Sequence, residues 1–175
     1  FVGLMSGTSL DGVDGVLVAF DDQAQAVAAP SQAATSRATA MAKRTLAHVH
    51  HPFEPLLRAE LLALQQPGPN EIHRAALAAN GVAKAYANVV AEVLAQAATT
   101  AATITAVGAH GQTVRHAPGE HDGTGYTVQW LSGALLAELC GIGVVCDFRS
   151  RDVAAGGEGA PLVPAFHAAA FGHSA

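Results

Sequence analysis

The chain opens with two apolar segments joined by a polar turn that is rich in glycine. Residues 1–6 (FVGLMS) and 12–20 (GVDGVLVAF) carry the Val, Leu and Phe side chains that favour strands. The turn between them, SGTSLDG from Ser6 to Gly12, adds hydroxyls, a carboxylate and glycine. Strands joined by so short a turn pair antiparallel. The second segment has no clean polar face, which is typical of a strand covered on both sides.

The next part of the chain predicts a weak strand and then helices. Residues 21–25 (DDQAQ) indicate a turn into a third strand near 26–29, and residues 31–51 indicate a loop with a short helix. We expect a short helix at 54–65 that ends before Pro67, and a long helix that begins after Asn70 as its N-cap. Gly81 in the long helix indicates close packing. The apolar stripe of this helix consists of Ile72, Ala76, Ala79, Ala83, Tyr86, Val90 and Val93.

The second half of the chain alternates strands and helices. It predicts a buried strand at 103–111 that breaks into a loop, a strand at 126–130, a helix at 132–139 and a further buried strand in GIGVVCDF. A helix is expected after Pro161. A meander followed by helix–strand alternation predicts an α/β fold, with a mixed sheet that starts as an antiparallel meander and has helices on its faces.

Composition narrows the classes of function. At 175 residues with 13% charged residues and a net charge of −5, the chain can bury a core but offers no basic field to attract nucleic acid. No apolar run approaches the roughly 18 residues of a membrane span, and the start lacks the layout of a signal peptide. We therefore expect a cytoplasmic protein with no membrane partner. Cys140 and Cys146 have no metal or redox spacing and are predicted to be free, reduced core thiols.

Three polar clusters follow predicted strands: residues 6–14, HGQTVRH at 110–116, and DFRSRDVAAGGEG at 147–159. Ligands of open α/β sheets bind beyond the carboxyl ends of the strands. We therefore expect the three clusters to form the functional site together.

The first cluster suits phosphate. Gly7 and Gly12 would let backbone N–H groups approach an anion, and Thr8 and Ser9 add hydroxyl donors. Asp11 and Asp14 are suited to a hydrated Mg²⁺ that bridges phosphate oxygens. The turn is not a Walker loop, since it joins two strands and has no Lys. The alternative is a structural hairpin with Asp at its turn positions.

The other clusters suit a polar ligand. Gln112 and Thr113 offer neutral groups for sugar hydroxyls, whereas a lone His such as His110 is usually structural. Arg149 and Arg151 lie next to a GGEG stretch and favour an anionic or polar ligand, the alternative being an ion-pair ladder that Asp147 and Asp152 complete. A separate group, His48, His50 and His51, could bind a metal, but its context favours an exposed loop.

Four blocks of the chain resemble a known family. GLMSGTSLDGVD, GAHGQTVRH, DFRSRDVAAGG and GAPLVPAFH are similar, in order and spacing, to the bacterial anhydro-N-acetylmuramic acid kinases, and they extend from Gly3 to His167. The chain departs from the family at Trp130, in TVQWLS where TVQIGN is usual, and at Glu158, in GGEGAP where GGQGAP is usual.

The resemblance implies a fold, an activity and site residues. The fold is a ribonuclease-H-like lobe of the actin, hexokinase and Hsp70 superfold. The activity uses ATP to open the 1,6-anhydro ring of anhydro-N-acetylmuramic acid and to phosphorylate O6, giving N-acetylmuramic acid 6-phosphate in cell-wall recycling. The resemblance places Thr113 and Arg151 at the sugar, with His110, Gln112 and Arg149 in the same blocks. It assigns the ATP phosphate loop to Gly7, Thr8, Ser9, Leu10, Asp11, Gly12, Val13 and Asp14, with Mg²⁺ near Asp11 and Asp14.

The resemblance also implies that residues 1–175 are the N-terminal lobe of a two-lobe kinase. The second lobe would supply the general-base Asp, so the chain alone is expected to be inactive and the full-length protein to form a homodimer. Three alternatives stay open: a nucleotide-binding switch module of the actin or Hsp70 type, a structural or interaction domain whose glycine-rich turns are only turns, and a sister kinase for another anhydro sugar.

Overall fold

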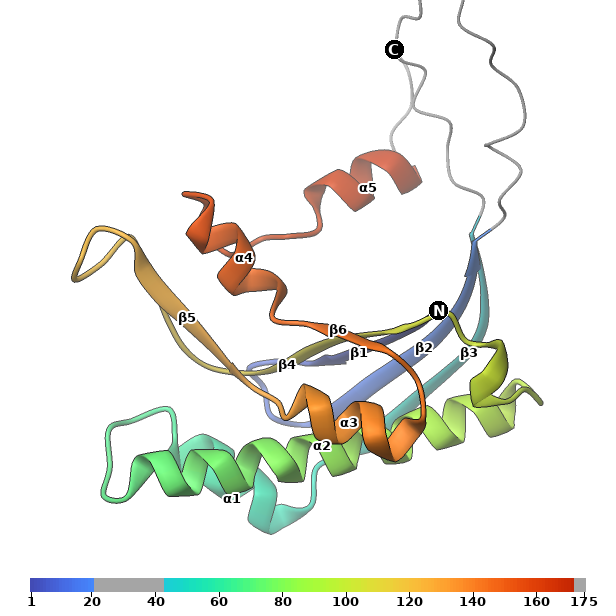
Figure 1. Ribbon diagram of the computed structural model, residues 1–175, viewed down its shortest axis with the longest axis horizontal. Coiled ribbons are helices and arrows are strands. Elements are labelled where there is room, and N and C mark those ends of the chain that lie inside the picture. The colour runs from blue at the N-terminus through green and yellow to red at the C-terminus, as the bar shows by residue number, and fades with distance from the viewer. Residues whose placement is uncertain (21–42, 172–175) are drawn as a thin grey trace, which may run out of the picture.

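The two antiparallel strands at the start of the chain belong to a six-stranded mixed sheet with helices, an α/β arrangement (Figure 1). The computed structural model describes residues 1–20 and 43–171. The strands are β1 Val2–Ser6, β2 Gly12–Phe20, β3 Lys43–Pro52, β4 Val107–Pro118, β5 Gly125–Trp130 and β6 Val144–Cys146. The helices are α1 Pro55–Ala63, α2 Glu71–Gln96, α3 Gly133–Cys140, α4 Phe148–Ala154 and α5 Pro164–Phe171, with a 3₁₀ turn at Ala101–Thr103.

The strand order is β3-β2-β1-β4-β5, and the long strand β4 organises the second half of the sheet. The first residues of β4 lie between β1 and β6 and pair parallel with both, from Val107 to Ala109. Its last residues, from Gln112 to Pro118, pair antiparallel with β5. As a result β1, β4 and β6 point the same way. The expected antiparallel start is confirmed for β1 and β2. Strand β3 also pairs antiparallel with β2, but the sequence did not predict a strand at its position.

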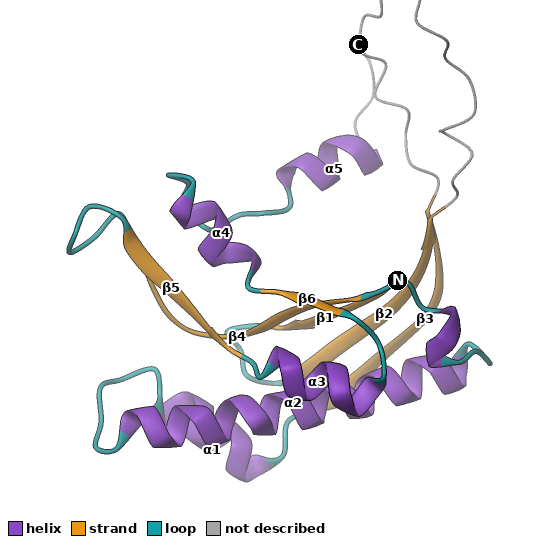
Figure 2. Cartoon of the chain, in the orientation of Figure 1, coloured by secondary structure: helices purple, strands orange, loops and turns teal. Residues whose placement is uncertain are grey.

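Helices α1, α2 and α3 lie on one face of the sheet, and α4 and α5 lie on the other side (Figure 2). The main core forms between α2 and the strands, where Val82, Tyr86, Val89 and Val93 are fully buried. Gly15 on β2 lets α2 approach the sheet, because a Cβ at this position would collide with Val89. Gly81 has the expected packing role, since a Cβ there would meet Leu57 of α1 at 2.8 Å.

The predicted long helix is confirmed as α2, but its start differs in detail. Asn70 precedes it with a left-handed backbone (φ 53°) and makes no capping hydrogen bond through its side chain. The buried residues in the first half are Ala75 and Ala78 rather than Ala76 and Ala79, and Ile72 is 90% exposed. The stripe was misplaced there because several Ala residues allow more than one apolar face. The prediction is correct from Ala83 onward, where larger side chains decide the buried face.

Three polar segments form regular structure that the sequence did not predict: 31–51 was expected to be a loop with a short helix, the residues after 111 a loop, and 148–154 was assigned no helix. The part of 31–51 that the structure describes is strand β3, and His48, His50 and His51 lie on it rather than in a loop. The segment 110–116 continues β4, and Phe148–Ala154 forms helix α4. The predicted strand near 26–29 lies outside the described residues. Polar side chains interrupt the apolar pattern in all three segments, so apolar periodicity was a poor guide.

The last predicted strand is shorter and more exposed than expected. GIGVVCDF contributes only Val144–Cys146 to the sheet, and Val145 is 56% exposed. Both cysteines are free, as expected. Cys146 is exposed, however, so the prediction of two core thiols is wrong for it. Among the described residues, no helix is both long enough and apolar enough to cross a membrane.

Replacing Gly15 by Ala should lower the free energy of unfolding by about 1–3 kcal/mol, because the new methyl group would be forced into the α2 interface. Gly143→Ala is the matched control, since its Cβ would meet no atom within 4 Å. Urea unfolding of the two variants measures the difference. Equal stabilities would mean that α2 does not pack this closely on β2.

Candidate functional site

The parallel strands bring the three predicted polar clusters to one edge of the sheet. Ser6 at the end of β1 pairs with Gln112 of β4, and Ala109 of β4 pairs with Cys146 at the end of β6. The turn after β1, the middle of β4 and the start of α4 therefore meet at the carboxyl ends of these strands. The prediction that the three polar clusters lie together at the carboxyl ends of the strands is confirmed.

A buried polar junction joins the first two clusters. The Ser6 hydroxyl lies 2.8 Å from the Tyr86 hydroxyl and donates to the Gly111 carbonyl at 3.2 Å. Gln112 is completely buried, and its Nε2 donates to the Gly7 carbonyl at 3.0 Å. Burial raises the pKa of Tyr86 to about 12, so its phenol stays protonated. Buried groups that bond one another in this way fix the turn after β1 relative to β4.

The turn between β1 and β2 has exposed backbone N–H donors next to one buried residue, Leu10. Leu10 is buried with φ 55°, and its carbonyl accepts a hydrogen bond from Arg58 Nε at 2.8 Å. Thr8 and Ser9 are exposed, and within the described residues their backbone N–H groups have no hydrogen-bond partner. Free backbone N–H groups in a concave turn attract anions.

The glycines of this turn have different roles. Gly12 lies against the backbone of β3, where a Cβ would collide with the His51 carbonyl. A Cβ at Gly7 would make only ordinary contact, at 3.5 Å from Ser9 Oγ. Gly12 is therefore required by strand packing, whatever the turn binds.

Two exposed carboxylates flank the turn. Ser9 Oγ donates to Asp11 Oδ1 at 2.6 Å, and this bond, before all other causes, holds the pKa of Asp11 below its ordinary value. Asp14 points to the sheet face opposite α2, where His48 Nε2 and His50 Nδ1 lie 3.3 and 3.2 Å from its Oδ1. No cluster of three or more His, Cys, Asp or Glu suited to a metal occurs in the described part. Mg²⁺, however, needs only one or two carboxylates beside phosphate and water, so Asp11 and Asp14 fit it in kind.

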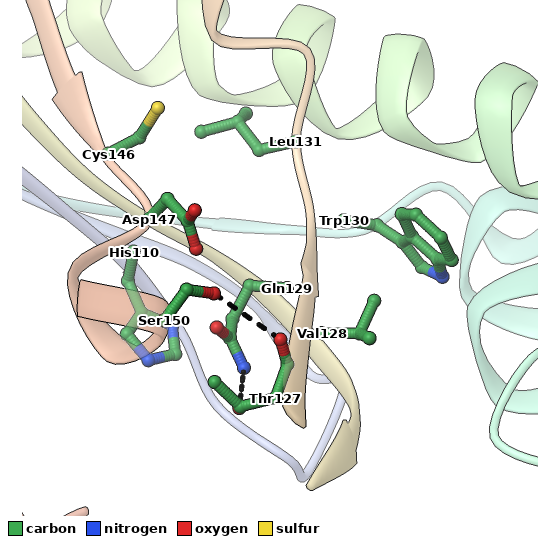
Figure 3. A pocket seen from close by; sticks show the side chains of 9 residues that line it. All are labelled: His110, Thr127, Val128, Gln129, Trp130, Leu131, Cys146, Asp147 and Ser150. Carbon is green, nitrogen blue, oxygen red and sulfur yellow. Dashed lines mark hydrogen bonds between the residues drawn. The ribbon is translucent and has the colours of Figure 1, made fainter. Parts of the chain in front are cut away.

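A pocket of about 330 Å³ lies between β4, β5 and the start of α4 (Figure 3). Its polar lining is His110, Thr127, Gln129, Asp147 and Ser150. Gln129 Nε2 donates to Thr127 Oγ1 at 2.7 Å and to Thr113 Oγ1 at 3.3 Å, while its Oε1 is buried without a partner. The Asp147 carboxylate also faces this pocket. The free groups of the pocket are mainly hydrogen-bond acceptors, which suit a ligand rich in hydroxyl or amide N–H donors.

His110 contributes a neutral imidazole to this pocket. Desolvation lowers its pKa, and the nearby Arg149 lowers it further, against a hydrogen bond to the Gly111 carbonyl that raises it. At neutral pH the ring carries no charge.

The predicted residues fall into two groups by their position. His110 lines the pocket, Thr113 reaches it through Gln129, and Arg149 contacts His110. Gln112 lies in the buried junction instead. Arg151 is exposed on the last turn of α4 and makes no ion pair or hydrogen bond within the described residues. Glu158 is exposed as well.

Sequence reasoning missed Thr127, Gln129 and Ser150. The signal for two of them was the alternation in YTVQW, which puts Thr127 and Gln129 on one face of β5 and Trp130 on the other. Figure 3 accordingly shows the Trp130 side chain pointing away from Asp147 and Ser150. Its bulk lies toward the helix face, where it packs against the core.

Comparison with known proteins gives a consistent family. The sequence model described as "AnmK: Anhydro-N-acetylmuramic acid kinase" matches residues 1–175. A protein of Cupriavidus metallidurans named anhydro-N-acetylmuramic acid kinase is 58% identical over 172 residues, which are 98% of this chain and 40% of that protein. A protein of the same name from Variovorax paradoxus is 58% identical over 98% of this chain and 41% of its own length. The chain thus spans about two fifths of these curated relatives. By the match along its whole length, the chain belongs to the anhydro-N-acetylmuramic acid kinase family.

Proposed function

We propose that the full-length protein is an ATP-dependent kinase that opens the 1,6-anhydro ring of anhydro-N-acetylmuramic acid and phosphorylates O6. The observation that carries the proposal is the meeting of an anion-binding turn and an acceptor-lined pocket at one sheet edge, in a chain of this family. Water adds to C1 as the C1–O6 bond breaks, and O6 takes the γ-phosphoryl group of ATP. The products are N-acetylmuramic acid 6-phosphate and ADP.

The turn between β1 and β2 is the proposed phosphate-binding element. The free N–H groups of Thr8 and Ser9 would bind phosphate oxygens, and the whole segment Gly7–Asp14 would surround them. Asp11 and Asp14 would hold Mg²⁺, which neutralises charge on the transferring phosphates. The hydrogen bond from Ser9 to Asp11 supports this role, because it orients the carboxylate and keeps it ionised.

The pocket beside β5 is the proposed sugar site. Gln129 Oε1 and Asp147 would accept hydrogen bonds from hydroxyl or amide groups of the sugar. Thr113 and Arg151 would contact the sugar from the rim, Arg151 with donors that pair with no described residue. A pocket with few free hydrogen-bond donors would disfavour the phosphates of ATP. The sugar would therefore bind in the pocket and the phosphates of ATP at the turn.

The remaining features of the reaction lie in the part of the relatives that this chain does not span. We propose that residues 1–175 are the first, ribonuclease-H-like lobe of an actin, hexokinase and Hsp70-type fold. A second lobe would bring the carboxylate that activates water, as the resemblance to the family implies. The full-length enzyme would work in the cytoplasm as a homodimer.

The reaction itself can be followed directly. Purified full-length protein with ATP, Mg²⁺ and anhydro-N-acetylmuramic acid should form ADP and N-acetylmuramic acid 6-phosphate in equal amounts, measured by mass spectrometry. The 175-residue chain alone should form neither. Sugar-independent ATP hydrolysis by the full-length protein would contradict the proposal, and product made by the isolated chain would contradict the need for a second lobe.

Asp11→Asn in the full-length protein should raise the KM for MgATP roughly tenfold, because a charge-assisted contact is lost, and leave the KM for the sugar unchanged. Thr8→Ala should act in the same direction. The matched control is Asp122→Asn, which changes another turn carboxylate that accepts backbone N–H groups, from Thr124 and Gly125, in the β4–β5 hairpin. A purely structural hairpin predicts no change in the KM for MgATP.

Arg151→Met and Thr113→Val should each raise the KM for the sugar, by roughly tenfold for the charged residue, with the KM for MgATP unchanged. The reason is that Thr113 bonds the pocket residue Gln129 and Arg151 follows the pocket residue Ser150 on α4, whereas neither belongs to the turn. Initial rates, measured with the concentration of each substrate varied in turn, give the two KM values separately. A rise confined to the KM for MgATP would reverse the proposed assignment of the two sites.

A further inference from the structure

Arg149 holds three elements together. From the first turn of α4, its Nε donates to His110 Nε2 on β4 at 2.7 Å. Its Nη1 donates to the Gly159 carbonyl, also at 2.7 Å, in the glycine-rich loop that follows α4. Both distances are short for hydrogen bonds from a guanidinium group. The fork of Arg149 therefore spans the space between the strand and the loop.

The hydrogen bond from Arg149 requires one particular tautomer of the His110 imidazole. Because Nε2 accepts from Arg149, it carries no hydrogen, and Nδ1, which lies 2.7 Å from the Gly111 carbonyl, must carry one and donate it. The ring is thus the neutral Nδ1–H tautomer. Protonation would put an N–H donor against the guanidinium and break the contact.

The loop is fixed from a second direction by the same helix. Gly159 N donates to Asp152 Oδ2 at 2.8 Å, and Gly157 N donates to the Asp152 carbonyl at 2.9 Å. Gly159 is buried with φ +70°, close to Val153 and to the Arg149 carbonyl. Arg149 therefore bonds the carbonyl of Gly159 and Asp152 bonds its N–H. Residues other than glycine rarely adopt the backbone conformation of Gly159.

We propose that Arg149 is a positioning residue that locks α4 and the loop 155–159 onto β4 through neutral His110, and so shapes the wall of the sugar pocket. The inference rests on the proposed function for its kinetic consequence. His110, Asp147 and Ser150 line that pocket, and they come from the two elements that Arg149 joins. With Nε and Nη1 engaged inside the protein, the main task of Arg149 is to hold this wall rather than to carry charge to the ligand.

A surface ion-pair ladder, the alternative drawn from DFRSRD, does not describe this arrangement. Within the described residues Arg149 forms no ion pair, and its two hydrogen-bond acceptors are neutral. Lys could not replace it, because a single ammonium group cannot reproduce the two directed contacts of the guanidinium fork.

The tautomer tests the contact without any enzyme activity. Nitrogen-15 spectra of the full-length protein, labelled at histidine and assigned by comparison with His110→Gln, should give the His110 ring the shifts of a protonated Nδ1 and an unprotonated Nε2. In Arg149→Met the Nε2 shift should move because its hydrogen-bond donor is gone, and exchange of the Gly159 amide hydrogen should become faster. An Nε2–H tautomer in the unmodified protein, or unchanged Gly159 exchange in the variant, would overturn the inference even if the protein phosphorylates no sugar.

A matched pair of variants tests the consequence for the pocket. His110→Gln keeps an acceptor near the Nε2 position for Arg149, whereas His110→Asn keeps only the donor to Gly111, and both remove the imidazole. Arg149→Met and His110→Asn should each raise the KM for the sugar by roughly tenfold, Arg149→Lys should act like Arg149→Met, and His110→Gln should be clearly less impaired. The double variant Arg149→Met/His110→Asn should be no worse than either single change, because one contact is lost in each.

The control is Arg74→Met, which removes an Arg with two hydrogen bonds to Glu60 between α1 and α2, on the sheet face opposite α4. It should lower stability without changing the KM for the sugar. Equal loss in His110→Gln and His110→Asn, or additive losses in the double variant, would overturn the inference. If the unmodified protein does not phosphorylate the sugar, the proposed function fails, and the spectra alone decide the role of Arg149.

Discussion

The arrangement of the site depends on the buried junction between β1 and β4. The Ser6 hydroxyl bonds the Tyr86 hydroxyl of α2 and donates to the Gly111 carbonyl of β4, and Gln112 of β4 donates to the Gly7 carbonyl of the turn. All three side chains are buried. Leaving one of these polar groups unpaired would cost about 1–3 kcal/mol, so the junction strongly favours one register of the turn on β4. That register sets where the turn, the pocket and α4 stand relative to one another.

From this junction two surfaces of different chemistry extend. The turn after β1 offers backbone donors and carboxylates, among them Asp11 with its lowered pKa, which suit phosphates and their metal. The pocket beside β5 offers mainly acceptors and a neutral imidazole, which suit a polyhydroxyl ligand. A kinase needs both kinds of surface, close together yet distinct, because phosphoryl transfer depends chiefly on positioning and electrostatics.

The sequence predicts best the elements whose apolar pattern is strong. Strands β1 and β2 and helices α1 and α3 were located closely, and α2 was located well where Tyr86 and the Val residues determine its buried face. Strand β3 was missed because its outward residues, such as His48 and His50, pair with Asp14 across an exposed face. Helix α4 was missed because it is short, and its arginines face the loop and the solvent.

The rule that ligands bind beyond the ends of strands correctly predicted that the three polar clusters lie together. It did not predict which residues of each cluster line the pocket. Gln112 has the composition of a ligand-binding residue and lies in the core, because its partner is a carbonyl of the turn. Gln129 comes from β5, a strand that the sequence places but whose pairing with β4 only the fold reveals. The roles of His110 and Arg149 depend on each other, and no local pattern encodes such a pair.

The most direct test of this account is hydrogen exchange of the full-length protein with each ligand alone. MgATP should slow exchange in peptides that cover residues 7–14, and anhydro-N-acetylmuramic acid should slow exchange in peptides that cover residues 126–130 and 147–152. Protection of the same peptides by both ligands, or protection by MgATP away from the turn after β1, would contradict the proposed division of the sheet edge into a nucleotide site and a sugar site.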